Sequence, residues 1–150
     1  MAENIIVTNR RAKRDYEIIE ALEAGIELKG TEIKSLRARR ANLSDSFARV
    51  ENNEIFIYNF HISPYEFGNI NNVDPLRTRK LLLHKNQILR LLMKTRAKGY
   101  TLIPLKVYLK SGFAKVEIAL ARGRRQFDKR EAIKEKEARL EIERSLRKKR

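Results

Sequence analysis

The sequence predicts a mainly β fold with helices: a small antiparallel, OB-like β-barrel with one longer inserted helix and a basic C-terminal tail. Three observations lead to this prediction. Short apolar segments with strand-like composition recur up to about residue 120, separated by turn-forming residues. One segment among them, 86–98, has helical spacing. Beyond residue 120 the alternation stops, so we divide the chain into a body, residues 1–120, and a tail, residues 121–150.

Both parts carry an excess of positive charge. The chain has 34 Lys and Arg against 19 Asp and Glu, a net charge of +15. The tail holds 13 of these cations and 6 of the acids, which gives it a net charge of +7 and leaves +8 on the body. Positive charge on both parts indicates a polyanionic partner, of which nucleic acid is the commonest.

Composition also excludes several classes of site. The chain has no cysteine, and its two histidines, His61 and His84, cannot supply a usual zinc site. We therefore expect no metal and no cofactor. No segment reaches the length of a spanning helix and no signal peptide follows Met1, so we expect a cytoplasmic protein without a membrane partner.

The N-terminal residues predict an arm rather than a structural element. The segment of residues 3–8 is too short and polar to anchor a domain, and Asn9–Arg14 contains four cations. We expect this arm to become ordered on a partner. The following segment, Tyr16–Leu28, fits both helical and strand spacing. Gly25 and Gly30 would be costly inside a helix, so we favour a strand that leads into Gly30.

A short helix is predicted next. Thr31 can cap it, with Ile33 and Leu36 facing inward and Lys34 and Arg37 facing outward.

A hairpin follows this helix. Ser46–Val50 and Ile55–Ile62 are rich in β-branched and aromatic residues, and the pair Asn52-Asn53 between them predicts the turn. Ser63-Pro64 ends the second strand. The Asn-rich segment Glu66–Asp74 is the longest predicted loop.

The last part of the body combines a helix with a second hairpin. Asn86–Lys98 has helical spacing and stops at Gly99. Leu102–Leu109 and Phe113–Leu120 alternate as strands around the turn Lys110-Ser111-Gly112, and Pro104 predicts an edge position or a bulge. The alternation predicts two shared faces, one formed by Leu105, Val107 and Leu109, the other by Ala114, Val116, Ile118 and Leu120.

The junction between body and tail, Ala121–Arg130, places five cations around one aromatic residue, Phe127. This combination can grip phosphates while the ring stacks on a base, although a solvated linker is the alternative. A helix is encoded from about Lys129, but its apolar residues do not share one face. We expect the tail to be largely disordered when free and helical in a complex.

Seven blocks of the chain occur in the order typical of one family: Asn9–Tyr16, Glu23–Ile26, Gly30–Arg37, Asn42–Ser46, His61–Tyr65, Arg77–His84 and Asp128–Arg130. From about residue 5 to residue 150 the chain resembles the SsrA-binding protein family, also called small protein B. The resemblance implies an OB-like barrel that binds the tRNA-like domain of transfer-messenger RNA and enters stalled bacterial ribosomes with it. It also implies that the protein replaces the missing anticodon arm, while its tail probes the vacant mRNA channel beside small-subunit rRNA.

Carried over onto this chain, the RNA-contact positions of the family fall on Glu23, Leu82 and His84. Without the resemblance, Glu23 would be assigned to a salt bridge, Leu82 to the core and His84 to the start of a helix. Glu23 could accept a hydrogen bond from a base N–H or a ribose 2′-OH. Many relatives have Asn where this chain has His84, and commonly His or Tyr where it has Phe127. Phe127 keeps the stacking ring but loses the polar tip.

The complete prediction assigns two groups of residues to RNA and expects a monomer. The body group consists of Arg10, Arg11, Lys13, Arg14, Tyr16, Glu23, Lys34, Arg37, Arg77, Arg79, Lys80, Leu82 and His84. The tail group, expected at the decoding centre of the ribosome, consists of Arg122, Gly123, Arg124, Arg125, Phe127, Asp128, Lys129 and Arg130.

Two other functional classes compete with this one. An RNA-processing enzyme would need clustered carboxylates for metals or a histidine pair for acid–base chemistry. The aspartates of this chain are dispersed and its two histidines lack a neighbouring motif, so we do not expect an enzyme. A generic ribosome-associated OB-fold protein would share the charge and the barrel but not the basic and aromatic junction.

Overall fold

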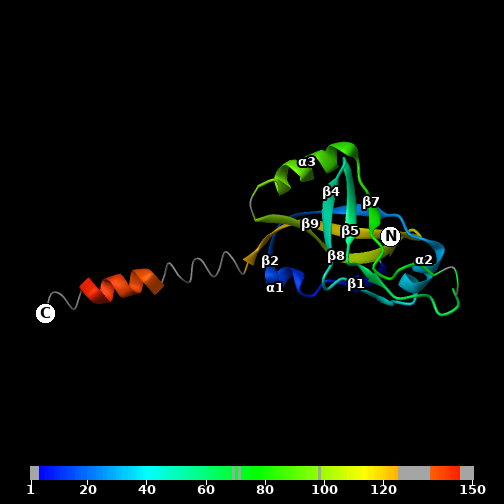
Figure 1. Cartoon of the computed structure of the whole chain (residues 1–150), viewed down its shortest axis with the longest axis horizontal. Helices are drawn as coiled ribbons and strands as arrows, with labels where there is room; N and C mark the ends of the chain where they lie inside the picture. Colours follow the sequence, from blue (N-terminus) through cyan, green and yellow to red (C-terminus); the bar gives the residue numbers. More distant parts are fainter. Residues whose placement is uncertain (1–3, 69, 71, 98, 125–135, 146–150) are drawn as a thin grey trace.

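The computed structural model of the chain describes residues 4–68, 70, 72–97, 99–124 and 136–145. Strands dominate the body, and a separate helical segment lies in the tail (Figure 1). The strands are β1 (Asn4–Thr8), β2 (Tyr16–Ile26), β3 (Ala41–Asn42), β4 (Phe47–Glu51), β5 (Glu54–Tyr58), β6 (His61–Ile62), β7 (Arg79–Leu82), β8 (Tyr100–Lys110) and β9 (Phe113–Gly123). The helices of the body are α1 (Ala12–Asp15), α2 (Gly30–Arg37) and α3 (Lys85–Thr95).

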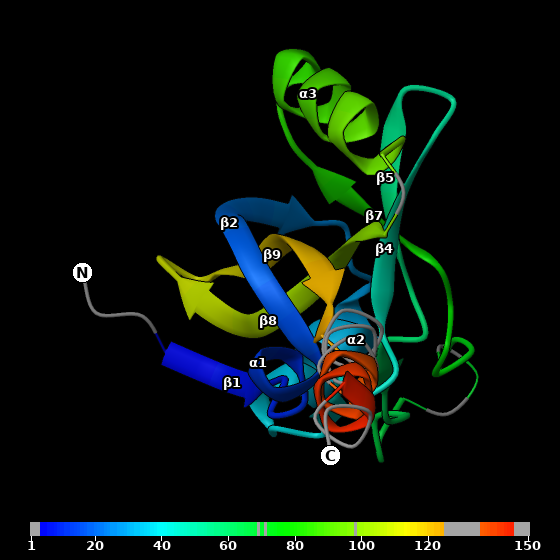
Figure 2. The same ribbon diagram turned by 90° about the vertical axis from the view of Figure 1, so that its left-hand side faces the viewer.

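The main sheet closes into a barrel. Its strand order is β1-β8-β4-β5-β7-β2-β9, and β9 also pairs with β8, so that six strands form a ring and β1 is added to the outside of β8. All of these pairings are antiparallel. In Figure 2, α3 stands above β7 and β5, while β1 and α1 lie on the other side of the barrel. The predicted mainly β, OB-like barrel with one longer helix is confirmed.

Both predicted hairpins are present, and their turns explain their sequences. Asn52 and Asn53 have φ values of 49° and 64°, and Ser111 and Gly112 have φ values of 53° and 82°. Two consecutive residues with positive φ form the two-residue turn that matches the twist of paired strands. The second strand of the first hairpin is shorter than predicted, because β5 ends at Tyr58 and His61–Ile62 pairs instead with β3.

The core fills the inside of the barrel with mostly aliphatic side chains from the strands, from α2 and from the connecting segments. Its fully buried members include Leu36, Leu43, Ile55, Ile57, Phe60, Leu81, Leu102, Val107, Val116 and Ile118. The predicted inward face of the last strand is confirmed by the burial of Val116, Ile118 and Leu120. The helix predicted over 86–98 is α3, which buries Ile88 and Leu91 against this core.

The N-terminal arm was predicted incorrectly. Residues 4–8 form β1, which pairs with β8, and the backbone N–H of Asn9 donates to the carbonyl of Leu105 at 2.7 Å. The side-chain amide of Asn9 donates to the carbonyl of Pro104 at 3.0 Å, and Ala12 of α1 is only 1% exposed. The β8 partners of β1 and Asn9 lie 95 or more residues away in the sequence, so local composition could not reveal them.

One predicted face of β8 is also wrong, because a bulge interrupts the alternation. The register shifts between Pro104 and Lys106, which confirms the bulge, although β8 is a central strand and not an edge. Leu105 therefore joins Ile103 in a second apolar cluster under α1, whereas Val107 faces the barrel core. This second cluster holds α1 against the outside of the barrel.

The segment from β2 to α2 follows the prediction in outline. The strand favoured for Tyr16–Leu28 is β2, which ends at Ile26. The helix begins at Gly30 and not after Thr31, and the carboxylate of Glu32 accepts a hydrogen bond from the Lys29 N–H at 2.8 Å. Leu36 is buried and Ile33 half-buried, while Lys34 and Arg37 are exposed as predicted.

The last strand of the sheet continues past Leu120, where we divide body from tail. β9 ends at Gly123, so the sheet extends three residues beyond Leu120. Residues 136–145 are helical, and every one of them is exposed. The predicted helix start near Lys129 lies outside the described residues. Among the described residues, no helix is long and apolar enough to span a membrane.

Candidate nucleic-acid interface

An open pocket of about 390 Å³ brings together three residues that are distant in the sequence, Glu23, Leu82 and His84. Glu23 comes from β2, Leu82 from the end of β7, and His84 from the position just before α3. The remaining lining residues are Gly25, Leu83, Gln87 and Lys115. The structure thus unites the three positions that the family resemblance selected.

Gly25 determines how Leu82 sits in this pocket. The two residues are partners in the β2–β7 pairing, and a Cβ atom on Gly25 would lie 3.2 Å from the Cβ atom of Leu82. A glycine here lets the leucine side chain lie across β2. Leu82 remains 47% exposed, so it is a surface residue and not part of the core.

His84 is positioned by the start of α3. Its carbonyl accepts a hydrogen bond from the Ile88 N–H, and its own N–H donates to Oε1 of Gln87 at 3.0 Å. The Gln87 side chain thereby closes the first turn of the helix, where backbone N–H groups lack partners within the helix. His84 is therefore both a helix-start residue and an exposed lining residue of the pocket.

The carboxylate of Glu23 is anchored through one of its oxygens. Oε2 accepts a hydrogen bond from the Tyr108 hydroxyl and lies 3.4 Å from Nζ of Lys110. The hydrogen bond from Tyr108 lowers the pKa of Glu23; burial opposes this shift, and Lys110 and Lys115 reinforce it. Because the side chain is 37% exposed, an ionised acceptor is presented to the solvent at the pocket.

This combination of groups suits an unstacked nucleotide. Leu82 offers an apolar surface for a base, and Lys115 offers a cation for a phosphate. A carboxylate repels phosphate but accepts hydrogen bonds from base N–H groups and from the ribose 2′-OH. The pocket can therefore discriminate between nucleotides in a way that cations alone cannot.

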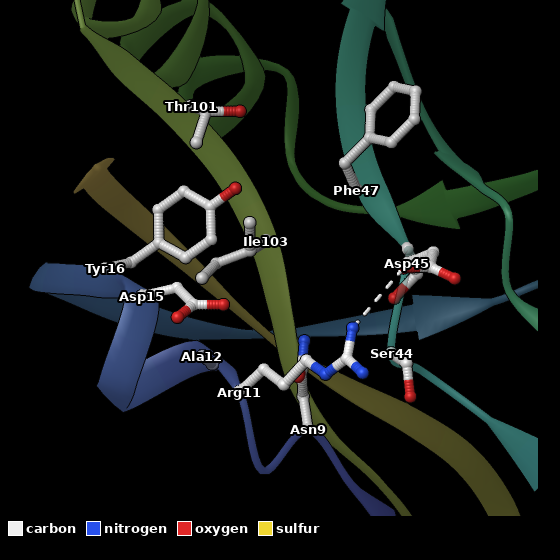
Figure 3. Close-up of a pocket in the computed structure, with 11 residues that line it drawn as sticks. Asn9, Arg11, Ala12, Asp15, Tyr16, Ser44, Asp45, Phe47, Thr101 and Ile103 are labelled. Atoms are coloured by element: carbon white, nitrogen blue, oxygen red, sulfur yellow. Dashed lines mark ion pairs between the residues drawn. The ribbon is translucent and has the colours of Figure 1, made fainter. Parts of the chain in front are cut away.

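A second pocket, of about 380 Å³, lies on another part of the barrel, between α1 and the beginnings of β2 and β4. Figure 3 shows Tyr16 and Phe47 on its walls and Arg11 reaching across it toward Asp45. The Arg11–Asp45 ion pair is loose, at 3.9 Å between two exposed side chains. Exposed pairs of this kind contribute little to stability, so Arg11 can exchange Asp45 for a phosphate.

The predicted arm and the predicted tail junction meet beside this second pocket. In the β2–β9 pairing, Gly123 is the partner of Tyr16. Nε of Arg124 donates to the Tyr16 carbonyl at 3.1 Å, and Arg122 pairs with Glu17 at 2.8 Å. The tail therefore leaves the barrel next to α1. The cations before and within this helix, Arg10, Lys13 and Arg14, are exposed.

Arg79 is a correction to the predicted RNA-binding group. It is 0% exposed, and its guanidinium donates to Oε2 of Glu32 at 2.5 Å and to the carbonyl of Phe60 at 2.5 Å. Since its charge is enclosed in the barrel wall, Arg79 cannot contact RNA directly in this structure. Nη2 of Arg77 forms an ion pair with Oε1 of the same residue, Glu32, at 2.6 Å. On the surface, Nζ of Lys80 forms an ion pair with Oε1 of Glu54 at 3.3 Å.

Of the remaining predicted residues, two lie on α2 and the others lie outside the described part of the chain. Lys34 and Arg37 are exposed on α2, and Nζ of Lys34 lies 5.4 Å from the centre of the Tyr65 ring. Figure 1 shows α2 at a different end of the barrel from α3, so the structure does not bring these cations to the Glu23 pocket. The predicted tail residues Arg125, Phe127, Asp128, Lys129 and Arg130 lie outside the described residues.

Sequence reasoning missed four residues around the first pocket: Gly25, Gln87, Tyr108 and Lys115. Gln87 carried a usable signal, because a Gln three residues after a helix-start position commonly closes the first turn. Tyr108 carried none, since its partner Glu23 is 85 residues away. Within the described residues, no three His, Asp or Glu side chains are grouped so that they could hold a metal ion.

Comparison with known proteins is consistent with this geometry. A family model described as SmpB protein matches residues 6–148. An SsrA-binding protein from Caldicellulosiruptor saccharolyticus is 63% identical over 142 residues, covering 95% of this chain and 90% of the relative. One from Enterococcus faecalis is 60% identical over 142 residues, covering 95% and 92%. A chain in a solved structure described as "tmRNA-SmpB: a journey to the center of the bacterial ribosome" is 57% identical, with a TM-score of 0.67 over 78% of this chain and 82% of that chain.

Proposed function

This chain belongs to the SsrA-binding protein (SmpB) family, and on that premise we propose that it binds the tRNA-like domain of transfer-messenger RNA and delivers it to stalled ribosomes. The observation that carries the proposal is the pocket between β2, β7 and α3, where an ionised carboxylate, an exposed leucine and a histidine converge. We expect a protein with this task to work in the cytoplasm as a monomer, and to act by binding and not by catalysis.

The second half of the proposal concerns the ribosome. We assign the cations around α1 and the tail junction to rRNA, because the tail leaves the barrel there and because Arg10, Arg11 and Lys13 are exposed beside it. In this proposal the Glu23 pocket holds the tRNA-like domain of transfer-messenger RNA while the tail enters the vacant mRNA channel. A helix of 20 residues is about 30 Å long, which is enough to probe such a channel.

Selectivity is the direct test of the RNA-binding proposal. The full-length protein is titrated with the tRNA-like domain and, at matched salt, with bulk tRNA. We expect tighter binding to the tRNA-like domain, and log affinity that falls with log salt by roughly 0.7 to 0.9 per phosphate contact. Equal affinity for both RNAs would favour the alternative, a generic ribosome-associated OB-fold protein.

A truncated chain tests whether the body binds RNA while the tail acts on the ribosome. Because β9 continues to Gly123, the cut belongs after Arg124 and not after Leu120. We expect the shortened protein to fold and to bind RNA with modestly reduced affinity, since the body has its own core and charge. It should bring RNA to stalled ribosomes but fail to support tagging of the stalled peptide. Normal tagging by the truncated protein would refute the role of the tail.

A further inference from the structure

We propose that Tyr108 is a positioning residue for RNA recognition: although buried beneath the surface, it fixes the direction in which the Glu23 carboxylate faces the RNA. This inference rests on the proposed function of the Glu23 pocket. It assigns a role in binding to a residue that does not line that pocket.

The placement of Tyr108 is unusual for a buried aromatic residue. Its neighbour Val107 faces the barrel core, so Tyr108 points to the opposite face of β8, and yet it is only 2% exposed. Nζ of Lys106 lies 5.2 Å from the centre of its ring. A buried phenol needs a hydrogen-bond partner, and here the partner is Glu23 on β2, on the far side of β9.

The hydrogen bond from Tyr108 fixes one of the two carboxylate oxygens of Glu23. Tyr108 and Lys110, two residues apart on β8, both donate to Oε2 of Glu23, and neither bond uses Oε1. An exposed glutamate otherwise samples several rotamers and must lose that freedom when it binds. A carboxylate held at one oxygen presents the other in a preferred direction, so that less entropy is lost when an RNA N–H or 2′-OH donates to it.

The charged and titratable groups around the carboxylate belong to two strands and the start of α3. Lys110 is on β8, Lys115 and Glu117 are on β9, and His84 lines the same pocket. Glu117 is the register partner of Glu23 and pairs with Lys106 at 3.8 Å. Tyr108 is thus a neutral donor within a charged cluster, and its contribution should depend little on salt.

The test is a double-mutant cycle in full-length protein, measured as affinity for the tRNA-like domain. Tyr108→Phe keeps the ring and removes only the hydroxyl. We expect it to reduce affinity about threefold to tenfold in the wild-type background, which is the typical effect of one hydrogen bond. In the Glu23→Ala background it should have no further effect. An equal loss in both backgrounds would mean that Tyr108 acts through the fold, and no loss in the wild type would also overturn the proposal.

The chain offers a matched control on another part of the barrel. The Tyr58 side chain forms a hydrogen bond with Glu51 in the first hairpin, and this contact raises the pKa of Tyr58. Tyr58→Phe removes a similar tyrosine–glutamate contact and should leave RNA affinity unchanged. In the free protein, NMR titration of Glu23 should show a higher pKa in Tyr108→Phe and no change in Tyr58→Phe.

Two further outcomes separate this inference from the proposed function. If Glu23→Ala alone has no effect on RNA affinity, the pocket assignment fails and Tyr108 fails with it. If Glu23→Ala weakens binding but Tyr108→Phe does not, only the positioning role fails. Should Tyr108→Phe not fold, Lys110→Met supplies a second cycle on the same oxygen, and its loss must shrink when Glu23 is absent.

Discussion

Two glutamates on this barrel, Glu23 and Glu32, show how one residue type serves binding in one region and stability in another. Glu32 is 3% exposed and is bonded at both oxygens: Oε1 accepts from Arg77 and from the Lys29 N–H, and Oε2 accepts from Arg79. Glu23 is held at one oxygen and open to solvent at the edge of a pocket. A buried carboxylate bonded at both oxygens holds structure together, whereas a partly exposed one held at a single oxygen can recognise a ligand with the other.

Removing the buried glutamate should have the largest effect on the free energy of unfolding. Glu32→Ala leaves Arg79 as an uncompensated buried charge and should lower the free energy of unfolding by about 3–5 kcal/mol. The matched control is Glu54→Ala, which removes the exposed partner of Lys80 and should cost about 1 kcal/mol or less. Urea denaturation measures both. Similar losses in the two variants would contradict the structural role of Glu32.

The pH dependence of stability tests whether the buried Glu32 is ionised in the folded protein. Burial raises the pKa of Glu32, but hydrogen bonds from Arg77, the Lys29 backbone and Arg79 outweigh it, so that the folded-state pKa lies below the ordinary value of 4.5. The contribution of Glu32 is therefore fully present above the unfolded-state pKa and is lost as pH falls through the folded-state pKa. The stability difference between wild type and Glu32→Gln should shrink below about pH 4.5. A difference that stays constant down to acid unfolding would argue against this ionisation.

Sequence reasoning recovered the parts of the molecule that local rules determine. The Asn52-Asn53 and Ser111-Gly112 turns, the helix near Asn86 and the alternation of the last strand were all predicted because neighbouring residues encode them. β1 and α1 were missed because long-range contacts with β8 hold them. The burial of Arg79 could have been predicted from strand alternation, although the surrounding cations suggested a surface position. In β7, Arg79 lies on the same face as buried Leu81, and Lys80 lies on the same face as exposed Leu82.

The binding half of the comparison is tested by Glu23→Ala. Hydrogen bonds to charged groups contribute about 1.5–3 kcal/mol, and partial exposure to solvent puts this one at the lower end. We expect a roughly tenfold loss of selectivity for the tRNA-like domain over tRNA. The variant should remain folded, with a small decrease in melting temperature because the Tyr108 hydroxyl loses an acceptor. Unchanged selectivity would return Glu23 to the role of a surface salt-bridge partner of Lys110.

A smaller effect is expected from Gly25→Ala. The added Cβ would lie 3.2 Å from Cβ and 3.3 Å from Cδ1 of Leu82, so that the leucine must shift in the pocket. Because Leu82 is half exposed and can move, we expect a loss of about 1 kcal/mol or less in RNA affinity and little change in stability. Gly30→Ala is the control, since no atom lies within 4 Å of its added Cβ. If both variants bind RNA like the wild type, the packing of Leu82 on Gly25 is irrelevant to binding.

An NMR titration of the labelled full-length protein with the tRNA-like domain distinguishes the roles of the exposed and the buried glutamate. We expect the largest amide shift changes at Gly25, Leu82, Leu83 and Gln87, around the exposed glutamate. We expect small changes at Glu32, Leu36 and Arg79, around the buried one. Changes centred on α2 and β7 near Arg79, with the Glu23 pocket unaffected, would contradict these roles.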